Sequence, residues 1–599
     1  MTALEPSTAT PDRIFAEWLR RFAAALEAGD GSAFADCFAP EGAWRDVLAF
    51  SWRFRTLIGG TEIAAHLERH AVDVAPRDVR AADGRMAPRS VRRGGRPVVE
   101  GFFDFDTAAG RVSGFVRLLA DEGTGPRAWL VFTGLQELHG HEERIGDRRP
   151  SGVEWSRNFA GENWLDARRR EARFEDRDPQ VLIVGAGQSG LILAARLRVM
   201  GFDALVIERQ PRVGDNWRTR YHSLTLHNEV WANSLPYIPF PPSWPTFVPK
   251  DKLAGFLEAY AELMELNVWT STELVSAERD ETEGRWTAVV RRDGEERTLT
   301  VPHLVLATGS VSGLPHRPAL PGLDDFRGEV MHSTDFTTGV EYAGKRAVVV
   351  GTGNSGHDVA QDLHANGAEV SIVQRSPTCV VSLVPSGTLV YGLYSEGPVE
   401  DIDLITASIP YPLLRETYQW LTKRTCELDR ELLEGLHRVG FETDFEPDGT
   451  GFHMRYLRTG GGYYINVGCS DLISDGSIGL LHARDLERLD ADGVRLRDGR
   501  HVPADLVVLA TGYENQQAAI GRMLGTDVAE RLGPIWGFDD EGFMRGVWTQ
   551  TGQEGLWIMG GALNEARLWS RFLAVQIGAS LVGASAADDV VPEPTVPVG

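Results

Sequence analysis

Short apolar runs, each followed by glycines and then by a helix, recur along the middle of this chain. The run Val181–Val184 precedes glycines at 185, 187 and 190, and a helical stretch, 191–201, follows at once. A short apolar run bounded by such a turn is typical of a strand buried on both faces of a parallel sheet. The pattern therefore predicts an α/β fold, in which parallel strands alternate with helices.

The glycines of this first turn have the GxGxxG spacing. At that spacing Gly185 permits the tight turn, Gly187 lets the backbone approach a pyrophosphate, and Gly190 lets the helix close onto the strand. The next apolar run ends in Glu208, at the offset where a carboxylate that binds a ribose is expected. Glycines alone would be weak support, but strand, turn, helix and acid together predict a dinucleotide site.

A second copy of the same logic follows later in the chain. Its glycines are Gly351, Gly353 and Gly356. Two such sites predict two dinucleotides. The second strand of this copy ends in Gln374, not in an acid, and Arg375 and Ser376 come next. A carboxylate there would repel a 2′-phosphate, whereas a guanidinium pairs with it, so NADPH is favoured over NADH. The alternative is that Arg375 is a surface arginine.

Residues 1–150 show a different pattern. One helical face carries Phe15, Trp18 and Phe22, and a second helix is expected with Thr61 as its cap. Alternation of apolar and polar residues then predicts antiparallel strands at 98–107, 111–120 and 128–138. This order resembles the nuclear-transport-factor-like or ketosteroid-isomerase-like α+β cone.

Such cones serve as binding or dimerisation modules, and some carry an enzyme site. If this one carries a site, the residues expected to line it are Trp44, Asp46, Trp52 and His66. The binding or dimerisation role is the favoured reading, so a homodimer is left open.

Two further segments give a resemblance to a known family. The segment 213–250 contains VGDNW, LTLH and a proline-rich loop, and an amphipathic helix follows it. The segment 326–336 fits the pattern FxGxxxHxxx(Y/F) at Phe326, Gly328, His332 and Phe336. Together with an ATG sequence at 307–309, these segments resemble the flavin-containing monooxygenase superfamily, in particular its YUCCA-like and related bacterial members. For His332 itself a structural role is favoured over a chemical one.

The resemblance covers roughly residues 178–580 and implies FAD in the first site and NADPH in the second. It further implies that the reduced flavin meets molecular oxygen and forms a C4a-(hydro)peroxyflavin, which oxygenates a small organic substrate. The residues expected to bind the cofactors are Gly185, Gly187, Gln188, Ser189, Gly190, Glu208, Arg209, Trp217, Thr308, Gly309, Gly351, Gly353, Asn354, Ser355, Gly356, Arg375, Ser376, Thr511 and Gly512.

The same resemblance gives two candidate catalytic residues. An asparagine of animal-type members and a histidine of YUCCA-like members both align with the segment YHSLTLHN, at His227 or one position later at Asn228. Both side chains are expected to face the flavin and to donate or position a proton. Simple bracing of the loop is the alternative for either one.

The resemblance leaves the reaction open. Oxygenation at nitrogen or sulfur is favoured. Baeyer–Villiger oxygenation of a ketone is the runner-up. It ranks lower because dedicated enzymes of that type have another motif and a tryptophan where this chain has GDNWRTRYHS and Phe336. Oxidative decarboxylation of an oxo-acid is a third option. A flavin-based ligand-binding or redox-sensing protein is the alternative from another class.

The domains are expected to divide in five parts. The fold class is α/β, with two Rossmann-like dinucleotide domains preceded by the α+β cone of residues 1–150. Residues 151–179 form a charged linker, 180–335 and 470–584 the FAD domain, 336–469 the NADPH domain with a helical insertion, and 585–599 a disordered tail.

Composition narrows the partners. With a net charge of −24 over 599 residues, the protein is a poor partner for nucleic acid. No basic leader or run of about twenty apolar residues is seen, so a cytoplasmic protein with no membrane contact is expected. The four cysteines lie far apart, which argues against a disulfide scaffold, a zinc ribbon or a dithiol pair, and no metal is expected.

Overall fold

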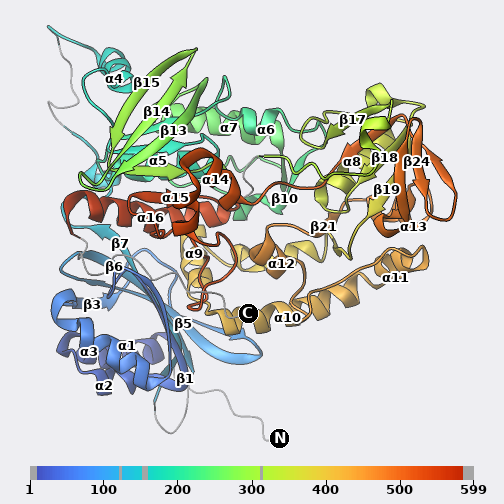
Figure 1. The fold of residues 1–599 in the computed structure, drawn as a ribbon. Coiled ribbons are helices and arrows are strands. Elements are labelled where there is room, and N and C mark those ends of the chain that lie inside the picture. Colours follow the sequence, from blue (N-terminus) through green and yellow to red (C-terminus); the bar gives the residue numbers. More distant parts are fainter. Residues whose placement is uncertain (1–9, 120–124, 152–158, 310–313, 585–599) are drawn as a thin grey trace, which may run out of the picture.

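The structure is a computed structural model that describes residues 10–119, 125–151, 159–309 and 314–584. The expected tail 585–599 lies outside these residues. The chain forms an N-terminal α+β unit and two nucleotide-fold units (Figure 1). No helix in the described ranges is both long and apolar enough to cross a lipid bilayer.

The N-terminal unit packs helices against one strongly curved sheet. Its helices are α1 (Pro11–Ala28), α2 (Gly31–Ala35) and α3 (Gly60–Val74). Its strands are β1 (Phe38–Val47), β2 (Phe54–Ile58), β3 (Arg77–Ala81), β4 (Arg89–Arg93), β5 (Arg96–Asp106), β6 (Gly110–Leu119) and β7 (Arg127–Leu138). The sheet order is β2-β1-β7-β6-β5-β3, with β4 also on β5, and only β1 and β7 pair in parallel. The three predicted strands are therefore confirmed, as β5 to β7.

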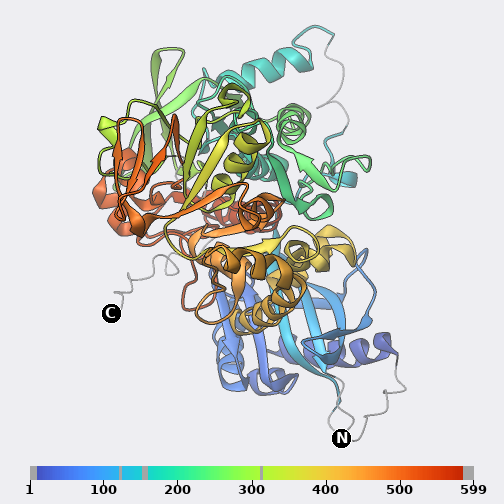
Figure 2. The same cartoon turned by 90° about the vertical axis from the view of Figure 1, so that its right-hand side faces the viewer.

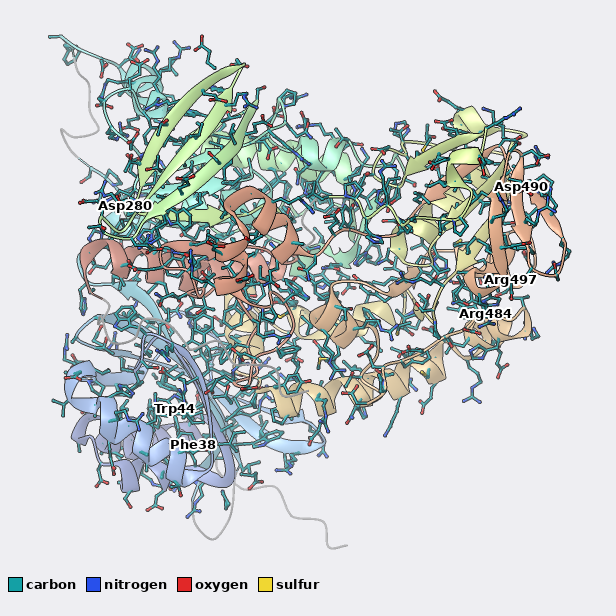
Figure 3. The ribbon with its side chains drawn as sticks, in the orientation of Figure 1. Phe38, Trp44, Asp280, Arg484, Asp490 and Arg497 are labelled. Atoms are coloured by element: carbon teal, nitrogen blue, oxygen red, sulfur yellow. The ribbon has the colours of Figure 1, made fainter. Side chains whose placement is uncertain are left out.

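Aromatic side chains fill the space between these helices and the sheet. Trp18, Phe22 and Phe103 are fully buried, and their rings contact one another. Trp44 and Phe38 lie in the same unit, close to the helices (Figure 3). The expected cap, Thr61, is wrong by two residues, because α3 begins at Gly60 and Gly59 is its N-cap.

The first nucleotide unit is a parallel sheet covered by helices. Its strands are β8 (Val181–Val184), β9 (Ala204–Ile207), β12 (Val268–Trp269), β16 (His303–Leu306) and β27 (Leu556–Ile558), in the order β12-β9-β8-β16-β27. Its main helices are α5 (Gln188–Val199), α7 (Lys250–Leu263) and α16 (Leu563–Val582). An antiparallel sheet of β13 (Thr272–Asp280), β14 (Arg285–Arg292) and β15 (Glu295–Val301) is inserted before β16. Smaller elements of this unit are α4 (Trp164–Arg173), α6 (Asp215–Arg218), β10 (Thr225–Glu229) and β11 (Phe247–Pro249).

The second nucleotide unit has the same architecture. Its parallel strands are β17 (Glu329–His332), β18 (Arg346–Val350), β19 (Glu369–Gln374), β22 (Gly479–His482) and β26 (Leu506–Leu509), in the order β17-β26-β18-β19-β22. Its helices are α8 (Asn354–Ala365) and α13 (Cys469–Ser474). An antiparallel sheet of β23 (Leu486–Asp490), β24 (Gly493–Leu496) and β25 (His501–Pro503) precedes β26.

This strand pairing differs from the expected domain boundaries. Residues 470–584 were expected to complete the first nucleotide fold, but β22 and β26 pair within the second sheet. Strand β17, which was expected in the first fold, also joins the second sheet by pairing with β26. The chain returns to the first sheet only at β27. The local pattern of a strand followed by ATG is the same in both folds, so it does not say which sheet the strand joins.

A mainly helical insertion lies between the second nucleotide unit and the N-terminal unit (Figure 2). It comprises β20 (Cys379–Ser382), the 3₁₀ segment η6 (Gly387–Ser395), α9 (Val399–Ala407), α10 (Tyr411–Leu428), α11 (Arg430–Arg438), α12 (Gly451–Thr459) and β21 (Tyr463–Asn466). Two further helices, α14 (Gln516–Leu524) and α15 (Thr526–Leu532), follow β26.

The N-terminal sheet is docked on the last helix, α16, which crosses the middle of the molecule (Figure 1). The ring of Phe572 on α16 lies so close to Gly134 of β7 that a Cβ there would be 2.8 Å from it. Phe54 of β2 contacts the rings of Phe572 and Phe543. The buried guanidinium of Arg45 lies 3.8 Å from the centre of the Phe543 ring. This face of the sheet is therefore covered from within the same chain.

Candidate cofactor and substrate sites

The first glycine turn is built by close backbone contacts. Gly185 has φ +110°, and a Cβ on it would lie 2.6 Å from the carbonyl oxygen of Ala307. A Cβ on Gly190 would lie 2.0 Å from the carbonyl oxygen of Gly185. No side chain fits at either position, because a real Cβ does not approach a backbone oxygen so closely. These two glycines are required by the protein itself.

Gly187 is different, because the fold leaves space beside it. A Cβ there would meet only the amide nitrogen of the Asn216 side chain, at 3.3 Å. Gly187 is the N-cap of α5 and offers no side chain to the free N–H groups at the start of that helix, where Gln188 and the buried Ser189 stand. A phosphate satisfies such groups and is favoured by the helix dipole, so the turn fits a pyrophosphate.

Glu208 lies directly after β9, next to this turn. Its carboxylate is buried and accepts hydrogen bonds of 2.9 Å from the backbone N–H groups of Ala186 and Gln210. These bonds fix the acid beside the glycines, where a ribose hydroxyl of a bound dinucleotide would reach it. Arg209 is exposed to solvent.

The second turn repeats the first almost contact for contact. Gly351 has φ +119°, and a Cβ on it would lie 2.3 Å from the carbonyl oxygen of Ala510. A Cβ on Gly356 would lie 2.0 Å from the carbonyl oxygen of Gly351, whereas one on Gly353 would meet nothing closer than 3.9 Å. Helix α8 begins directly after Gly353. The second turn therefore fits a pyrophosphate as well as the first does.

The residues around the second turn are partly engaged with the insertion. Asn354, the first residue of α8, accepts a hydrogen bond of 2.9 Å from the N–H of Ile465, and Ser355 beside it is half-buried. Gln374 exchanges two hydrogen bonds of 2.8 Å with the backbone of Glu442.

Arg375 and Ser376 are exposed directly after β19. Their side chains are therefore available to a ligand at the carboxyl edge of the second sheet.

The two ATG segments lie at the carboxyl ends of the two sheets. Thr308 and Gly309 follow β16, and Thr511 and Gly512 follow β26. The side-chain amide of Gln516 donates a hydrogen bond of 3.2 Å to the carbonyl oxygen of Gly309 and so joins the two ends. Both glycine turns are also at the carboxyl edges of their sheets, which is where open α/β sheets bind ligands. The two candidate cofactor sites thus face a common region.

His332 holds part of this region together. One ring nitrogen, Nε2, lies 3.1 Å from the carbonyl oxygen of Gly512, and the other, Nδ1, lies 3.0 Å from the hydroxyl of Thr334. The side chain is fully buried, and burial lowers its pKa. Since both nitrogens are engaged within the protein, these bonds support the structural role expected for His332.

Trp217 lies on α6 and links the segment 213–250 to the starts of helices α5 and α16. Its indole N–H donates a hydrogen bond of 3.3 Å to the side chain of Gln188, whose amide donates one of 3.4 Å to the carbonyl oxygen of Gly561. Gln188 begins α5, and Gly561 comes just before α16. These hydrogen bonds place the segment 213–250 over the first turns of α5 and α16.

A cavity of about 200 Å³ lies next to these hydrogen bonds, between the segment 213–250, the start of α16 and the insertion. Its lining residues are His227, Asn228, Tyr391, Phe452, His453, Tyr456, Tyr463, Ile465, Gly561 and Ala562. The structure therefore brings the two predicted catalytic residues to one cavity, together with aromatic residues of the insertion.

Burial shifts the pKa values of the titratable groups at this cavity towards their neutral forms. Burial lowers the pKa of His227 to about 4. Burial, and to a smaller extent the neighbouring His227, lowers the pKa of His453 to about 4. Behind the wall, Glu565 accepts hydrogen bonds from the phenol of Tyr456 (2.7 Å) and the N–H of Ala562 (2.9 Å), and burial raises its pKa.

Sequence reasoning missed the residues that the insertion contributes to this cavity. His453 and Tyr456 stand at i and i+3 on α12, which places them on one face of the helix. That spacing was available in the sequence as HMRY, but nothing local shows which face meets the cavity.

The candidate residues of the N-terminal unit bond to one another and to neighbouring groups of that unit. Asp46 accepts hydrogen bonds from the hydroxyl of Thr133 (3.0 Å) and from the N–H of Phe50 (3.1 Å), and it lies 3.4 Å from Nε2 of His66. Trp44 donates a hydrogen bond of 2.9 Å to the same threonine. Trp52 packs at the edge of this core. Because the polar groups of Trp44, Asp46 and His66 contact one another through Thr133 and Asp46, they form a structural network.

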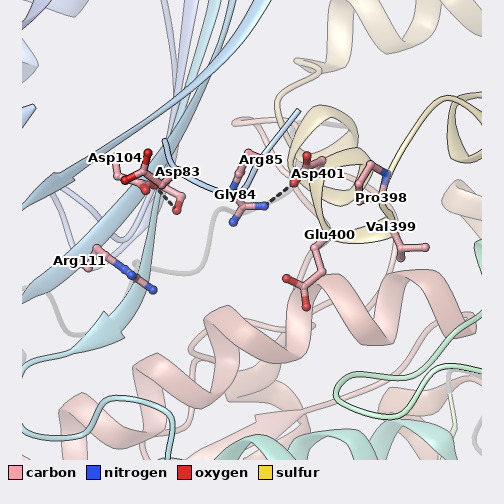
Figure 4. A pocket seen from close by; sticks show the side chains of 10 residues that line it. Asp83, Gly84, Arg85, Asp104, Arg111, Pro398, Val399, Glu400 and Asp401 are labelled. Atoms are coloured by element: carbon pink, nitrogen blue, oxygen red, sulfur yellow. Dashed lines mark hydrogen bonds and ion pairs between the residues drawn. The ribbon is translucent and has the colours of Figure 1, made fainter. Parts of the chain in front are cut away.

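A larger, polar pocket of about 400 Å³ lies where the N-terminal unit meets α9 (Figure 4). Arg85 forms an ion pair of 2.7 Å with Asp401 across it, and Asp401 also accepts a hydrogen bond of 2.7 Å from the N–H of Met86. These bonds join the two units, and the pocket is open to solvent at their boundary.

Known proteins similar to this chain include several monooxygenases. A family model described as flavin-binding monooxygenase-like matches residues 178–393. The chain is 34% identical to indole-3-pyruvate monooxygenase YUCCA1 of Oryza sativa subsp. japonica, over 59% of this chain and 80% of that protein. It is 32% identical to probable indole-3-pyruvate monooxygenase YUCCA9 of Arabidopsis thaliana, over 56% of this chain and 75% of that protein.

Two solved structures match this chain at low identity. A flavin-containing monooxygenase from Stenotrophomonas maltophilia superposes with a TM-score of 0.45 at 18% identity, covering 68% of this chain and 99% of that one. The protein OTEMO in complex with FAD and NADP gives a TM-score of 0.49 at 17% identity, covering 69% of this chain and 87% of that one.

Proposed function

Because this chain belongs to the flavin-binding monooxygenase-like family, we propose that it is an NADPH-dependent FAD monooxygenase that oxygenates a small organic substrate at nitrogen or sulfur. The observation that carries the proposal is the pair of glycine turns, each shaped for a pyrophosphate, at carboxyl edges joined through Gln516 and Gly309. A reductant in one turn and a flavin in the other would then meet at one place.

The first turn is the proposed FAD site. The residues proposed to hold FAD are Gly185, Gly187, Gln188, Ser189, Gly190, Glu208, Arg209, Trp217, Thr308 and Gly309. A Cβ on Gly187 would meet no backbone atom and only the end of the Asn216 side chain, and this and the fixed carboxylate of Glu208 support the assignment. When bound, FAD together with molecular oxygen supplies the oxygenating chemistry, and the protein supplies binding, orientation and exclusion of water.

The second turn is the proposed NADPH site. The residues proposed to hold NADPH are Gly351, Gly353, Asn354, Ser355, Gly356, Arg375 and Ser376, with Thr511 and Gly512 at the neighbouring strand end. The exposed guanidinium of Arg375 supports a preference for the 2′-phosphate.

His227 and Asn228 are the proposed catalytic residues. Both line the cavity, and Asn228 is buried. A neutral His227 has one nitrogen that donates and one that accepts, so it can hold a proton at one side of the ring and receive one at the other. Aromatic side chains form much of the wall of this cavity, which suits flavin chemistry that requires the exclusion of water.

Two other reactions remain candidates for specific reasons. Relatives named indole-3-pyruvate monooxygenases favour oxidative decarboxylation of an oxo-acid. Solved neighbours that include a cyclohexanone monooxygenase keep the oxygenation of a ketone as the other alternative. A redox-sensing role is the alternative from another class.

The proposal is tested with the FAD-loaded protein, NADPH and ¹⁸O₂. We expect one labelled oxygen atom in the product of an amine or sulfide for each NADPH consumed. NADPH oxidation that yields only hydrogen peroxide with amines, sulfides, ketones and oxo-acids would contradict a monooxygenase and favour the sensing role.

A further inference from the structure

We propose that the 200 Å³ cavity selects an uncharged substrate with a single-ring aromatic body, that it rejects carboxylates, and that His453 binds the polar atom of that substrate. This inference rests on the proposed function, since it names the substrate class of the same site. It separates this chain from relatives whose names give an oxo-acid, indole-3-pyruvate, as the substrate.

The size and walls of the cavity give the body of the substrate. A dry cavity of about 150 Å³ is known to hold benzene, so about 200 Å³ suits one ring with a short side chain. Four aromatic rings of the insertion line it, those of Tyr391, Phe452, Tyr456 and Tyr463. Aromatic rings favour edge-to-face contact with another ring, so these walls suit an aromatic ligand.

The charges around the cavity exclude a carboxylate. The lining residues include no lysine or arginine, and the two histidines are neutral at pH 7, because burial lowers the pKa of each to about 4. The half-buried acid Glu565 lies directly behind Tyr456. A carboxylate that entered would lose its water and find no positive partner, which is strongly unfavourable.

Arginines of the neighbouring elements are already engaged. Arg567 of α16 is buried and forms two bonds of 2.8 Å with Asp403 of α9. Arg455 of α12, two positions after His453 and on another face of the helix, forms bonds of 2.6 Å with Asp444 and Glu446. Neither guanidinium is available as a partner for a bound carboxylate.

His453 supplies the group that binds a polar atom. Its Nδ1 is buried and has no hydrogen-bond partner in the described part of the chain. Rings of Tyr391, Phe452 and Tyr456 surround the imidazole, with centroids 5.8–5.9 Å away. A buried polar atom without a hydrogen-bond partner costs free energy. A carbonyl or hydroxyl of the ligand that reaches Nδ1 removes this cost and therefore binds more tightly.

The test compares two ligands that differ in one group, which is charged in the first ligand and apolar in the second. Phenylpyruvate and 1-phenylpropan-2-one share the phenyl, methylene and carbonyl groups, and the carboxylate of the first is a methyl group in the second. Each is titrated into the oxidised, FAD-loaded protein at pH 7.5, and binding is followed by the change in the flavin absorption spectrum. We expect 1-phenylpropan-2-one to bind at least tenfold more tightly. Equal or tighter binding of phenylpyruvate, or no binding of either, would overturn the inference.

Variants locate the effect at His453. His453→Phe keeps the ring and the apolar contacts, and we expect it to weaken binding of 1-phenylpropan-2-one at least fivefold with unchanged FAD content. His453→Arg introduces a cation, and we expect it to strengthen binding of phenylpyruvate at least tenfold. The matched control is His437→Phe on α11, an exposed histidine outside the cavity, which should leave both affinities unchanged. If His453→Phe binds the ketone as the unmodified protein does, His453 is not the binding group.

The binding assay needs no turnover, so it separates this inference from the proposed function. A protein that prefers the neutral ligand but oxygenates nothing would refute the monooxygenase and leave the preference standing. A protein that oxygenates a substrate but binds phenylpyruvate more tightly would refute the preference and leave the monooxygenase standing.

Discussion

The phenol of Tyr456 donates a hydrogen bond of 2.7 Å to the carboxylate of Glu565 and thereby joins the insertion to the last helix. Tyr456 lies on α12, and Glu565 lies in the first turn of α16. The same carboxylate accepts the N–H of Ala562, a residue that lines the cavity. One carboxylate thus fixes two walls of the cavity that come from segments more than one hundred residues apart in the chain.

Tyr456→Phe should loosen this wall. The lost bond to a carboxylate is worth about 2 kcal/mol, and the wall helps to exclude water from the cavity. We expect a larger share of the NADPH to be consumed with release of hydrogen peroxide, at unchanged FAD content, as measured by peroxide and NADPH assays. The matched control is Tyr418→Phe on α10, whose ring lies 5.1 Å from that of His453 and whose hydroxyl has no carboxylate partner among the described residues. The same peroxide yield in both variants would contradict the role given to the bond.

Gly187→Glu should abolish FAD retention without unfolding the protein. The fold leaves space at Gly187, but a carboxylate there would occupy and repel the pyrophosphate. We expect a colourless protein with a circular dichroism spectrum like that of the unmodified chain. Gly190→Ala is the contrasting variant, because its Cβ would lie 2.0 Å from the carbonyl oxygen of Gly185 and should destabilise the fold itself. A yellow Gly187→Glu protein would refute the FAD assignment.

Arg375→Ala should raise the KM for NADPH about tenfold or more and change the KM for NADH little. The reason is that the lost guanidinium pairs with a 2′-phosphate, which NADH lacks. Steady-state kinetics with both coenzymes measures the ratio. Arg484→Ala is a control with the same change of charge, since Arg484 is exposed and paired with Glu442 after the adjacent strand β22. Equal effects on the two coenzymes would show that Arg375 does not read the 2′-phosphate.

His357→Phe should make the stability of the protein less sensitive to acid. His357 is fully buried and stacked on Tyr464 with the ring centres 3.8 Å apart, and burial lowers its pKa from 6.5 to about 4. The neutral form is favoured in the folded state, so its contribution is present above pH 6.5 and is lost as the pH falls from 6.5 towards 4.

Removal of this group should reduce the slope of unfolding free energy against pH by up to about 1.4 kcal/mol per pH unit in that window. Denaturant unfolding at pH 5.0, 5.5 and 6.0 measures the slope. Between pH 7 and 8 the free energy of unfolding should change with pH equally in the variant and the unmodified protein. A slope at low pH equal to that of the unmodified protein would contradict the assignment.

Phe572→Ala should separate the N-terminal sheet from α16. The ring is fully buried and contacts Phe54 and Phe132, so its truncation should cost about 3–5 kcal/mol. We expect a lower thermal unfolding midpoint and faster proteolysis between the two units. Trp420→Ala, which removes a large ring that is 65% exposed on α10, is the control and should change neither. Unchanged stability of Phe572→Ala would show that the docking is not needed for the fold.

Much of the fold follows from short-range patterns. Val181–Val184 and the glycines after it predict β8, the turn and α5, because a strand followed closely by a helix permits no side chain at Gly185 or Gly190. The sequence of the second turn determined the same geometry at Gly351 and Gly356 for the same reason.

Other features were decided only by contacts between distant segments. The strand before Thr511 reads like the strand before Thr308, and only its pairing with β18 assigns it to the second sheet. The cavity depends on where α12 meets α16, so the positions of His453 and Glu565 follow from packing and not from their neighbours in the chain. Local sequence fixes backbone conformation through sterics and hydrophobic period, whereas the choice among equivalent strand edges and helix faces depends on which apolar surfaces the whole chain can bury together.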